Sequence, residues 1–410
     1  MNKKIIIIGA GPAGLFTAIQ AKNMHNKVII LEKNSKAGRK LLMSGAGQCN
    51  ITHSGEVAEL LEHYGEEEYF LMSALYQFSN RDLLRFFGER GIEFTENEEG
   101  KIFPSTYKSQ DILEILLKEC EEKNIKIKYS HAVKRISFLE EENEFRVFTD
   151  NQQYASQILV IAAGGKSYPG TGSSGDGYKF AAEMGHKIKQ PKPALTPVYV
   201  KNYMFSDLAG ISIENAEISL WRDSKLKKRW SGDILFTHQG LSGPGIINYS
   251  RYIDEGELLK IRLVEAKNEA DLDRIIREKI KINGSKNIKN ILKSFELPER
   301  LIIDILKKEG ISRDKKSAQI NKNERSIIVK NLYSLEFEVD HLGSFREAMV
   351  TKGGINLNEI DPSTMESKLR PGLFAVGEVL DIDGDTGGYN LHAAFSTAFL
   401  AGKEIFEKFE

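Results

Sequence analysis

The feature that most constrains this chain is the segment 5–14, Ile-Ile-Ile-Ile-Gly-Ala-Gly-Pro-Ala-Gly. A short apolar run that ends in glycines predicts a buried strand, a tight turn and a helix. A second apolar run, 28–31, ends at Glu32, about 20 residues further on, as in a dinucleotide-binding βαβ unit. We therefore expect a parallel sheet with a dinucleotide site at this turn.

The residues of the turn have separate expected roles. Gly9 permits the sharp turn, Gly11 lets the backbone approach a pyrophosphate, and Gly14 lets the helix pack close to the strand. The helix then begins with Pro12 and Ala13, and its positive N-terminus favours phosphate. Glu32 is expected to bind the ribose hydroxyls. Two further cofactor contacts are expected, Lys33 and Val133.

Composition excludes several other classes of protein. Lys3 and Lys4 before an apolar run resemble a secretory signal, but glycines and Pro12 interrupt that run. No other stretch approaches the roughly 18 apolar residues of a membrane span. Two cysteines, Cys49 and Cys120, exclude a disulfide framework, and no Cys/His spacing suggests a metal site. We expect a cytoplasmic protein.

The charge balance indicates a small-molecule partner. The net charge is -1, from 57 basic and 58 acidic residues, which gives no general electrostatic case for nucleic acid or an anionic membrane. A small-molecule substrate is therefore expected, and nucleic acid is not. No feature of the sequence specifies an oligomeric state.

The order of predicted elements indicates an α/β fold interrupted by an insertion. Strands and helices alternate in the first half, and a late buried strand, 373–377, precedes a final helix. We predict a discontinuous dinucleotide domain, an inserted β-rich domain and a small helical subdomain. Their expected bounds are 1–190 with 341–410, 191–266 with about 331–340, and 267–330.

The late strand favours FAD over a nicotinamide nucleotide. Flavoproteins of the glutathione-reductase type end such a strand in Gly-Asp or Gly-Glu beside the ribityl chain, then begin a helix beneath the flavin. A helix N-terminus there stabilises the negative charge that develops on the flavin pyrimidine during reduction. The alternative is a strand and a helix that only close the sheet. The expected contacts are Gly377, Glu378, Asp381, Gly387, Gly388, Tyr389 and Asn390.

Two further glycine-rich segments are predicted to lie near the cofactor. The segment 38–50 offers backbone donors and basic side chains for phosphates, although it could also be an ordinary flexible loop. Within it, Cys49 is expected to pack rather than to react. The segment 163–165 follows another buried strand and lacks the spacing of a second nucleotide fingerprint. The expected contacts are Arg39, Lys40, Ser44, Gly45, Gly47, Asn50, Ala163, Gly164 and Gly165.

Three side chains are candidates for polarising a substrate oxygen or supplying a proton: His238, Tyr389 and His392. A histidine can act as an acid or a base near pH 7. His238 could equally hydrogen-bond within its own loop.

Taken together, these segments resemble the HI0933-like (YhiN- and BaiN-like) family of bacterial flavoproteins. The matching motifs span nearly the whole chain in order. They are 9–14, 38–50, 103–105, 163–165, 175–178, 235–238, 243–244, 351–355, 372–378 and 387–390. One departure is Gln48, where the family usually has arginine, so a charge near the cofactor loop is missing.

The resemblance implies noncovalent FAD on a Rossmann-like domain with strand and helical insertions. Some members of the family are linked to reduction of carbon–carbon double bonds conjugated to a ketone, and others carry an aminoacetone-oxidase label. We expect an FAD-dependent oxidoreductase that passes hydride from flavin N5 to an enone-like small molecule, with NAD(P)H as a transient donor. The alternatives are a flavin-dependent amine oxidase and a flavoprotein acting on RNA. The lysines of 267–330 are the only sequence support for RNA.

Overall fold

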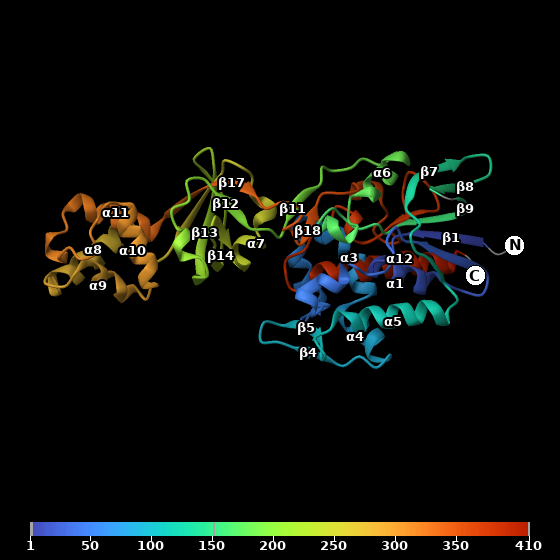
Figure 1. The fold of residues 1–410 in the computed structure, drawn as a ribbon, viewed down its shortest axis with the longest axis horizontal. Helices are drawn as coiled ribbons and strands as arrows, with labels where there is room; N and C mark the ends of the chain where they lie inside the picture. Colours follow the sequence, from blue (N-terminus) through green and yellow to red (C-terminus); the bar gives the residue numbers. More distant parts are fainter. Residues whose placement is uncertain (1–2, 151, 409–410) are drawn as a thin grey trace. The chain divides into compact units, whose positions relative to one another are not determined.

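The computed structural model describes residues 3–150 and 152–408 and divides into two compact units (Figure 1). The first unit comprises the chain up to Ala194 together with the chain from Phe345 onward. The second unit is the segment between them, Leu195–Ser344.

A five-stranded parallel sheet forms the centre of the first unit, with the order β19-β10-β1-β2-β6. Its strands are β1 (Lys3–Ile8), β2 (Asn26–Leu31), β6 (Lys126–Lys128), β10 (Ile158–Ile161) and β19 (Leu373–Ala375). The inner strands are continuous apolar runs because a parallel sheet in an α/β fold is covered on both faces.

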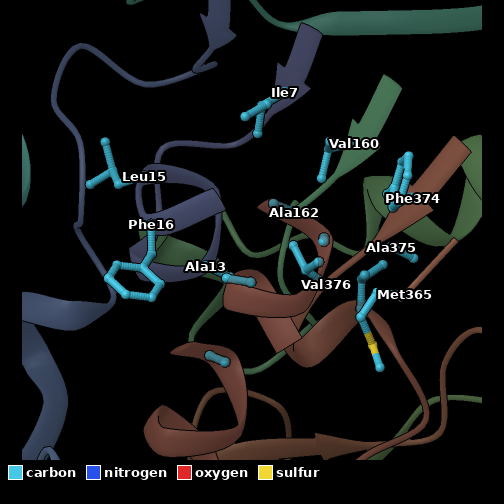
Figure 2. Close-up of a cluster of buried hydrophobic side chains, with 14 of the residues drawn as sticks. Ile7, Ala13, Leu15, Phe16, Val160, Ala162, Met365, Phe374, Ala375 and Val376 are labelled. Atoms are coloured by element: carbon cyan, nitrogen blue, oxygen red, sulfur yellow. The ribbon is translucent and has the colours of Figure 1, made fainter. Parts of the chain in front are cut away.

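The register brings together residues that are far apart in sequence. Ile7 pairs with Val160, and Val160 pairs with Phe374, so one row of buried side chains crosses three strands. Figure 2 shows these three side chains within the core. Two helices, α1 (Pro12–Ala21) and α12 (Tyr389–Glu407), pack closely together because Gly402 has no side chain; a Cβ there would lie 2.3 Å from the Cβ of Gln20.

Smaller elements complete the first unit. The helices are α2 (Val57–Leu61), α3 (Glu68–Gln77), α4 (Asn80–Gly88), α5 (Ser109–Glu122) and α6 (Asp176–Glu183). The strands are β3 (Thr52–His53), β4 (Phe94–Glu96), β5 (Lys101–Pro104), β7 (Val133–Leu139), β8 (Glu144–Thr149), β9 (Gln153–Ser156), β11 (Lys192–Ala194) and β18 (Val350–Lys352). The short 3-10 helices are η1 (Leu41–Gly47), η2 (Glu62–Glu67), η3 (Pro169–Thr171), η8 (Leu357–Glu359) and η9 (Gly377–Val379).

The second unit contains a closed antiparallel barrel with the order β12-β15-β14-β13-β16-β17. Its strands are β12 (Val198–Val200), β13 (Ser212–Arg222), β14 (Lys225–Phe236), β15 (Gly240–Ser242), β16 (Leu258–Arg262) and β17 (Leu335–Leu342). Three short helices connect them, η4 (Ser206–Leu208), α7 (Pro244–Ile247) and η5 (Ser250–Tyr252).

A group of helices interrupts the barrel between β16 and β17 (Figure 1). Its amphipathic helices bury an isoleucine- and leucine-rich face in the same apolar core as the barrel strands. The helices are α8 (Glu269–Ile282), α9 (Ile288–Leu292), η6 (Lys293–Phe295), α10 (Glu299–Lys308), η7 (Ser317–Gln319) and α11 (Lys322–Tyr333).

The predicted fold class is confirmed: a parallel Rossmann-like sheet carries an inserted antiparallel barrel with helices. Among the described residues, no helix is both long and apolar enough to cross a membrane.

Candidate cofactor and active site

Two glycines of the first turn are required by the fold itself. Gly9 has a φ of +107°, and a Cβ there would lie 2.5 Å from the Ala162 carbonyl oxygen. A Cβ on Gly14 would lie 2.0 Å from the Gly9 carbonyl oxygen. Packing between β1, α1 and the end of β10 therefore excludes any side chain at either position.

Gly11 differs, because nothing in the protein requires a glycine there. Its φ of -80° and ψ of 178° are open to any residue, and a Cβ would meet no atom within 4 Å. Gly11 is the N-cap of α1, and no side chain caps this N-terminus. An uncapped helix end with clear space in front of it fits the pyrophosphate of a dinucleotide.

Glu32 ties the turn to the end of β2. Its buried carboxylate accepts hydrogen bonds from the Ala10 backbone N–H at 2.8 Å and from Asn34, through the backbone N–H at 2.8 Å and the side-chain Nδ2 at 2.7 Å. The neighbouring Lys33 ammonium pairs with Asp176 at 2.6 Å. Glu32 is thus held rigidly at the predicted ribose site, whereas Lys33 is directed to an acid of this chain.

A polar cluster joins the 38–50 loop to the segment after β19. Lys40 Nζ lies 2.6 Å from Glu378 Oε2 and also donates to Ser167 Oγ. The Ser167 hydroxyl donates to Glu378 Oε1 at 2.9 Å, and the Thr351 backbone N–H donates to the same oxygen at 2.9 Å. A Cβ on Gly165 would collide with Thr351 Oγ1 and Glu378 Oε1, at 2.5 and 2.8 Å. The cluster thus brings three predicted residues together.

Sequence reasoning missed Ser167 and Thr351, although both lie beside segments that it had singled out. Thr351 opens the motif at 351–355, and Ser167 follows the glycines at 163–165. Two of the predicted cofactor contacts, Ala163 and Gly164, are half-buried and follow the end of β10. The sequence signal that could have identified Ser167 and Thr351 is a polar residue within or next to a glycine-containing motif.

The rest of the 38–50 loop is ordered by its own backbone. The Ser44 hydroxyl donates to the Leu41 carbonyl at 2.7 Å, and the Cys49 N–H donates to the Ser44 carbonyl at 3.1 Å. The Asn50 side-chain oxygen is buried and has no hydrogen-bond partner among the described residues. It therefore fits a donor group of a bound cofactor. Three more predicted residues lie here and are exposed or half-buried, Arg39, Gly45 and Gly47.

The two cysteines are packing residues. Burial raises the pKa of the Cys49 thiol to about 12, and it does the same to Cys120. A thiol with such a pKa holds almost no reactive thiolate at neutral pH.

The N-terminus of α12, like that of α1, begins at a glycine and has no side-chain cap. Gly388 is its N-cap without a side-chain cap, and a Cβ there would collide with the backbone of Thr52 at 2.7 Å. Asn390 holds the preceding turn, because its side chain accepts from the Gly384 N–H and donates to the Gly384 carbonyl, both at 2.8 Å. The uncapped N–H groups fit a group that becomes negatively charged, as the flavin pyrimidine does.

Buried carboxylates lie in the segment between η9 and α12. Asp381 and Asp383 are 2% and 1% exposed, and Lys189 Nζ lies 2.5 Å from Asp381. Burial, together with the charges of both aspartates, raises the pKa of Glu67 to about 7. Asp381, predicted as a cofactor contact, thus lies in an ion pair within a cluster of acidic side chains.

An unpredicted histidine pair lies beside the first residue of α12. His63 Nδ1 lies 3.0 Å from Asp385 Oδ2, and the His63 ring stacks on the Tyr389 ring with centroids 4.2 Å apart. The His53 ring also stacks on Tyr389, with centroids 5.2 Å apart. The His63 side chain is 42% exposed, so solvent or a substrate can reach it. His63 lies in no recognisable motif, and nothing in the sequence indicated it.

The three predicted catalytic residues are in different surroundings. His392 is fully buried, its ring bonded to Thr52 Oγ1 at 3.1 Å and near the Phe78 carbonyl at 3.4 Å, and burial lowers its pKa to about 4. Its role as a catalytic residue stays a prediction, which the burial of the ring and its lowered pKa disfavour. Burial raises the pKa of the Tyr389 phenol, which makes it a poorer acid. His238 is exposed in the β14–β15 turn of the second unit, and its role stays a prediction.

A Rossmann-type sheet with three such features is typical of the class of FAD-dependent oxidoreductases, to which this protein belongs. The features are the uncapped turn at Gly11, the Lys40–Glu378 cluster and the uncapped N-terminus of α12. The chain belongs to the HI0933-like family, since the model described as the HI0933-like protein Rossmann domain matches residues 3–404.

The chain is similar to proteins whose names state a reaction. The chain is 31% identical over 403 residues to the ribosomal RNA dihydrouridine synthase of Escherichia coli (strain K12), covering 98% of this chain and 97% of that protein. It is 29% identical over 417 residues to the 3-dehydro-bile acid delta(4,6)-reductase of Clostridium scindens, covering 100% of each.

A solved structure of similar fold is the 3-ketosteroid-delta4-(5alpha)-dehydrogenase from Rhodococcus jostii RHA1. Its TM-score is 0.52 at 13% identity, covering 98% of this chain and 97% of that chain. At this identity the likeness concerns the fold alone.

Proposed function

We propose that this protein is an FAD-dependent reductase of carbon–carbon double bonds conjugated to a carbonyl group, with NAD(P)H as the electron donor. The two curated relatives support one reaction, although their substrates differ. Dihydrouridine is uridine with two hydrogens added across C5–C6, a double bond conjugated to the C4 carbonyl. A 3-dehydro-bile acid delta(4,6)-reductase, by its name, saturates double bonds conjugated to a ketone.

The first unit supplies the positions for this chemistry. Gly11 and the N-terminus of α1 would receive the pyrophosphate, and Glu32 the ribose. Lys40 and Glu378, fixed by their mutual ion pair, would bracket the middle of the cofactor, and the N-terminus of α12 would face its pyrimidine. FAD, when bound, supplies hydride to one carbon of the double bond.

The other carbon requires a proton, and the observation that carries the proposal is the His63–Asp385 pair. Asp385 accepts the Nδ1–H of His63, so Nε2 is the ring nitrogen left for a substrate, and it would donate a proton from the doubly protonated imidazolium form. Among the described residues, no hydrogen-bond partner takes up that nitrogen. Stacking on Tyr389 holds the ring at the start of α12, where the flavin is expected. His63 is therefore our candidate for the proton donor, in place of His392.

The donor nucleotide would visit the site without a domain of its own. The described residues contain one parallel sheet with one glycine fingerprint, and FAD is expected to occupy it. NADH or NADPH would bind transiently, reduce the flavin and leave before the acceptor binds.

The test separates the two half-reactions of the purified FAD-loaded protein. Anaerobic NADH or NADPH should bleach the flavin, and an enone should then restore its colour. His63→Gln should leave the bleaching rate unchanged and slow reoxidation by the enone about 10²–10⁴-fold, the usual contribution of a general acid. Bleaching by small amines but not by NAD(P)H would instead indicate an amine oxidase. Equal reoxidation rates in the wild type and His63→Gln would remove His63 as the donor.

Asp385→Asn is the companion variant, because it keeps the shape of the partner and changes the orientation of the imidazole. It should slow the same step by a smaller factor. Lys403→Gln, an exposed change at the far end of α12, is the control and should alter neither half-reaction.

A further inference from the structure

The near-zero net charge of the chain conceals a strong separation of charge. Residues 267–330 contain 17 lysines and arginines and 10 aspartates and glutamates, which is a net charge of +7. The remaining residues contain 40 basic and 48 acidic side chains, a net charge of -8. The cationic segment coincides with the helices α8 to α11 of the second unit. A polyanion would therefore be attracted more strongly to this part of the protein than to the remainder.

Much of the positive charge on α8 is neutralised within the helices. Arg274 pairs with Asp271 at 2.7 Å and with Glu278 at 3.0 Å. Asp273 pairs with Arg325 at 2.6 Å and with Arg277 at 3.0 Å. These cations are satisfied by the protein and are not available to a ligand.

The cations at the C-terminal end of α8 are different. Lys281 and Lys286 are exposed, and neither has an acidic partner among the described residues. The Lys316 ammonium contacts only a neutral side chain among the described residues, the Asn287 amide oxygen at 3.1 Å. We call these three lysines, Lys281, Lys286 and Lys316, the α8 corner.

Backbone pairing brings together the segments that carry Lys286 and Lys316. Asn287 and Lys316 form an antiparallel bridge, the Ser317 N–H donates to the Lys286 carbonyl at 2.9 Å, and the Ile288 N–H donates to the Lys315 carbonyl at 2.9 Å. Lys286 and Lys316, which belong to separate segments, therefore lie on adjacent backbone, and their like charges repel each other. Two acids lie nearby: Asp314 accepts from Asn287 Nδ2 at 3.4 Å, and Glu324 pairs with the adjacent Lys315 at 2.6 Å. Fixed, unpaired cations of this kind are satisfied by the phosphates of a polyanion.

We propose that the α8 corner holds the phosphate backbone of an RNA whose uridine is the substrate. This proposal rests on the proposed function, because the C5=C6 bond of uridine is a double bond conjugated to a carbonyl. RNA is favoured over an anionic membrane because Ile282 is the one large apolar side chain of 267–330 that is markedly exposed among the described residues, at 81%. An amphipathic membrane surface inserts an apolar face, which a single side chain does not make, and three lysines are fewer than the roughly 4–8 of a polybasic cluster that binds anionic lipids by charge alone.

Contacts to phosphates carry no sequence information but position the nucleic acid. The α8 corner would therefore set affinity and salt dependence, and the active site in the first unit would select the base. This division explains how a family with one reaction can include a protein named for RNA and another named for a bile acid.

The test compares two charge reversals of equal size within the second unit. Lys281→Glu with Lys286→Glu changes the α8 corner. Lys225→Glu with Lys227→Glu is the matched control on the exposed end of β14. The probe is a fluorescein-labelled RNA stem–loop with a uridine loop, titrated by anisotropy over a range of salt concentrations. The α8-corner variant should bind at least tenfold more weakly, and its slope of log K against log salt should fall by about 2. The control should bind like the wild type.

Three outcomes would overturn the proposal. Equal losses in both variants would show general attraction rather than a site, and unchanged RNA binding in the α8-corner variant would remove the site. Binding to phosphatidylglycerol vesicles that depends on Lys281 and Lys286, without RNA binding, would assign the corner to a membrane. Enone reduction by the variants is measured in parallel and should equal that of the wild type. RNA binding that depends on the corner, in a protein that reduces no enone, would refute the proposed function and leave the docking surface standing.

Discussion

Gly11 and Gly14 lie three residues apart in one motif, yet the structure predicts opposite consequences of replacing them with alanine. A methyl group on Gly14 would lie 2.0 Å from the Gly9 carbonyl oxygen, far inside normal contact. A methyl group on Gly11 would meet no protein atom within 4 Å, at a backbone conformation that alanine adopts freely. The first substitution should therefore damage the fold, and the second should damage only the binding of a ligand.

The magnitudes follow from the geometry. Overpacking of a well-packed core costs about 1–3 kcal/mol. A backbone oxygen cannot move aside as a side chain can, so the collision in Gly14→Ala should cost about 3 kcal/mol of unfolding free energy. The better helix propensity of alanine offsets roughly 1 kcal/mol of this loss, which leaves a net destabilisation of about 2 kcal/mol. Gly11→Ala should change the stability of the apoprotein by less than about 0.5 kcal/mol, as a surface substitution does. Its FAD dissociation constant should rise at least tenfold, because the methyl group occupies the approach path of the pyrophosphate.

The assay is urea unfolding of the deflavinated proteins, followed by FAD titration monitored by quenching of flavin fluorescence. Wild type, Gly11→Ala and Gly14→Ala are compared in the same buffer. The reasoning fails if apo Gly11→Ala is destabilised as much as Gly14→Ala, or if it retains the affinity of the wild type for FAD. Either result would mean that the pyrophosphate does not lie against this turn.

Two further predictions concern buried polar groups. Glu32→Ala should weaken FAD retention and also cost about 1–3 kcal/mol of apoprotein stability, because the Ala10 N–H and the Asn34 donors lose their acceptors. Glu32→Gln should cost less, because its one amide oxygen still accepts on one side. Unchanged FAD retention in Glu32→Ala would place the ribose elsewhere. The folded pKa of His392, about 4, lies below its ordinary value of 6.5, so its contribution is complete above pH 6.5 and is lost as the pH falls towards 4. Urea unfolding would measure the difference in unfolding free energy between the wild type and His392→Gln. This difference should shrink by about 3 kcal/mol between pH 6.5 and pH 4. A difference that stays constant would show that the ring is not buried and neutral.

The parallel sheet could be predicted because its signal is local. Each inner strand is buried on both faces, so its residues form a continuous apolar run, and the glycines that follow mark the turn. The amphipathic helices and the final helix follow from the same kind of pattern. The closed barrel was expected only as a β-rich insertion, since closure depends on the pairing of β12 with β17, which lie at opposite ends of the inserted segment.

The active-site clusters could not be predicted, because their members are distant in sequence. Lys40 and Glu378 are 338 positions apart, and His63 and Asp385 are 322 positions apart. No spacing rule links residues across such distances, and only the packing of separate segments brings them within hydrogen-bonding reach. His392 was chosen because it lies in a conspicuous motif, but helix α12 turns its ring into the core.

The amino-acid sequence alone determined the βαβ unit, its glycine turn and the acid after the second strand, because backbone conformation and burial on both faces act over neighbouring residues. It also determined a total charge near zero. The tertiary structure decided which glycines the fold itself requires and which one it does not, which histidine meets an aspartate, and how the charge is distributed. These are properties of atoms in contact across the fold, and at Gly11 the deciding fact is the absence of any protein atom near the missing side chain.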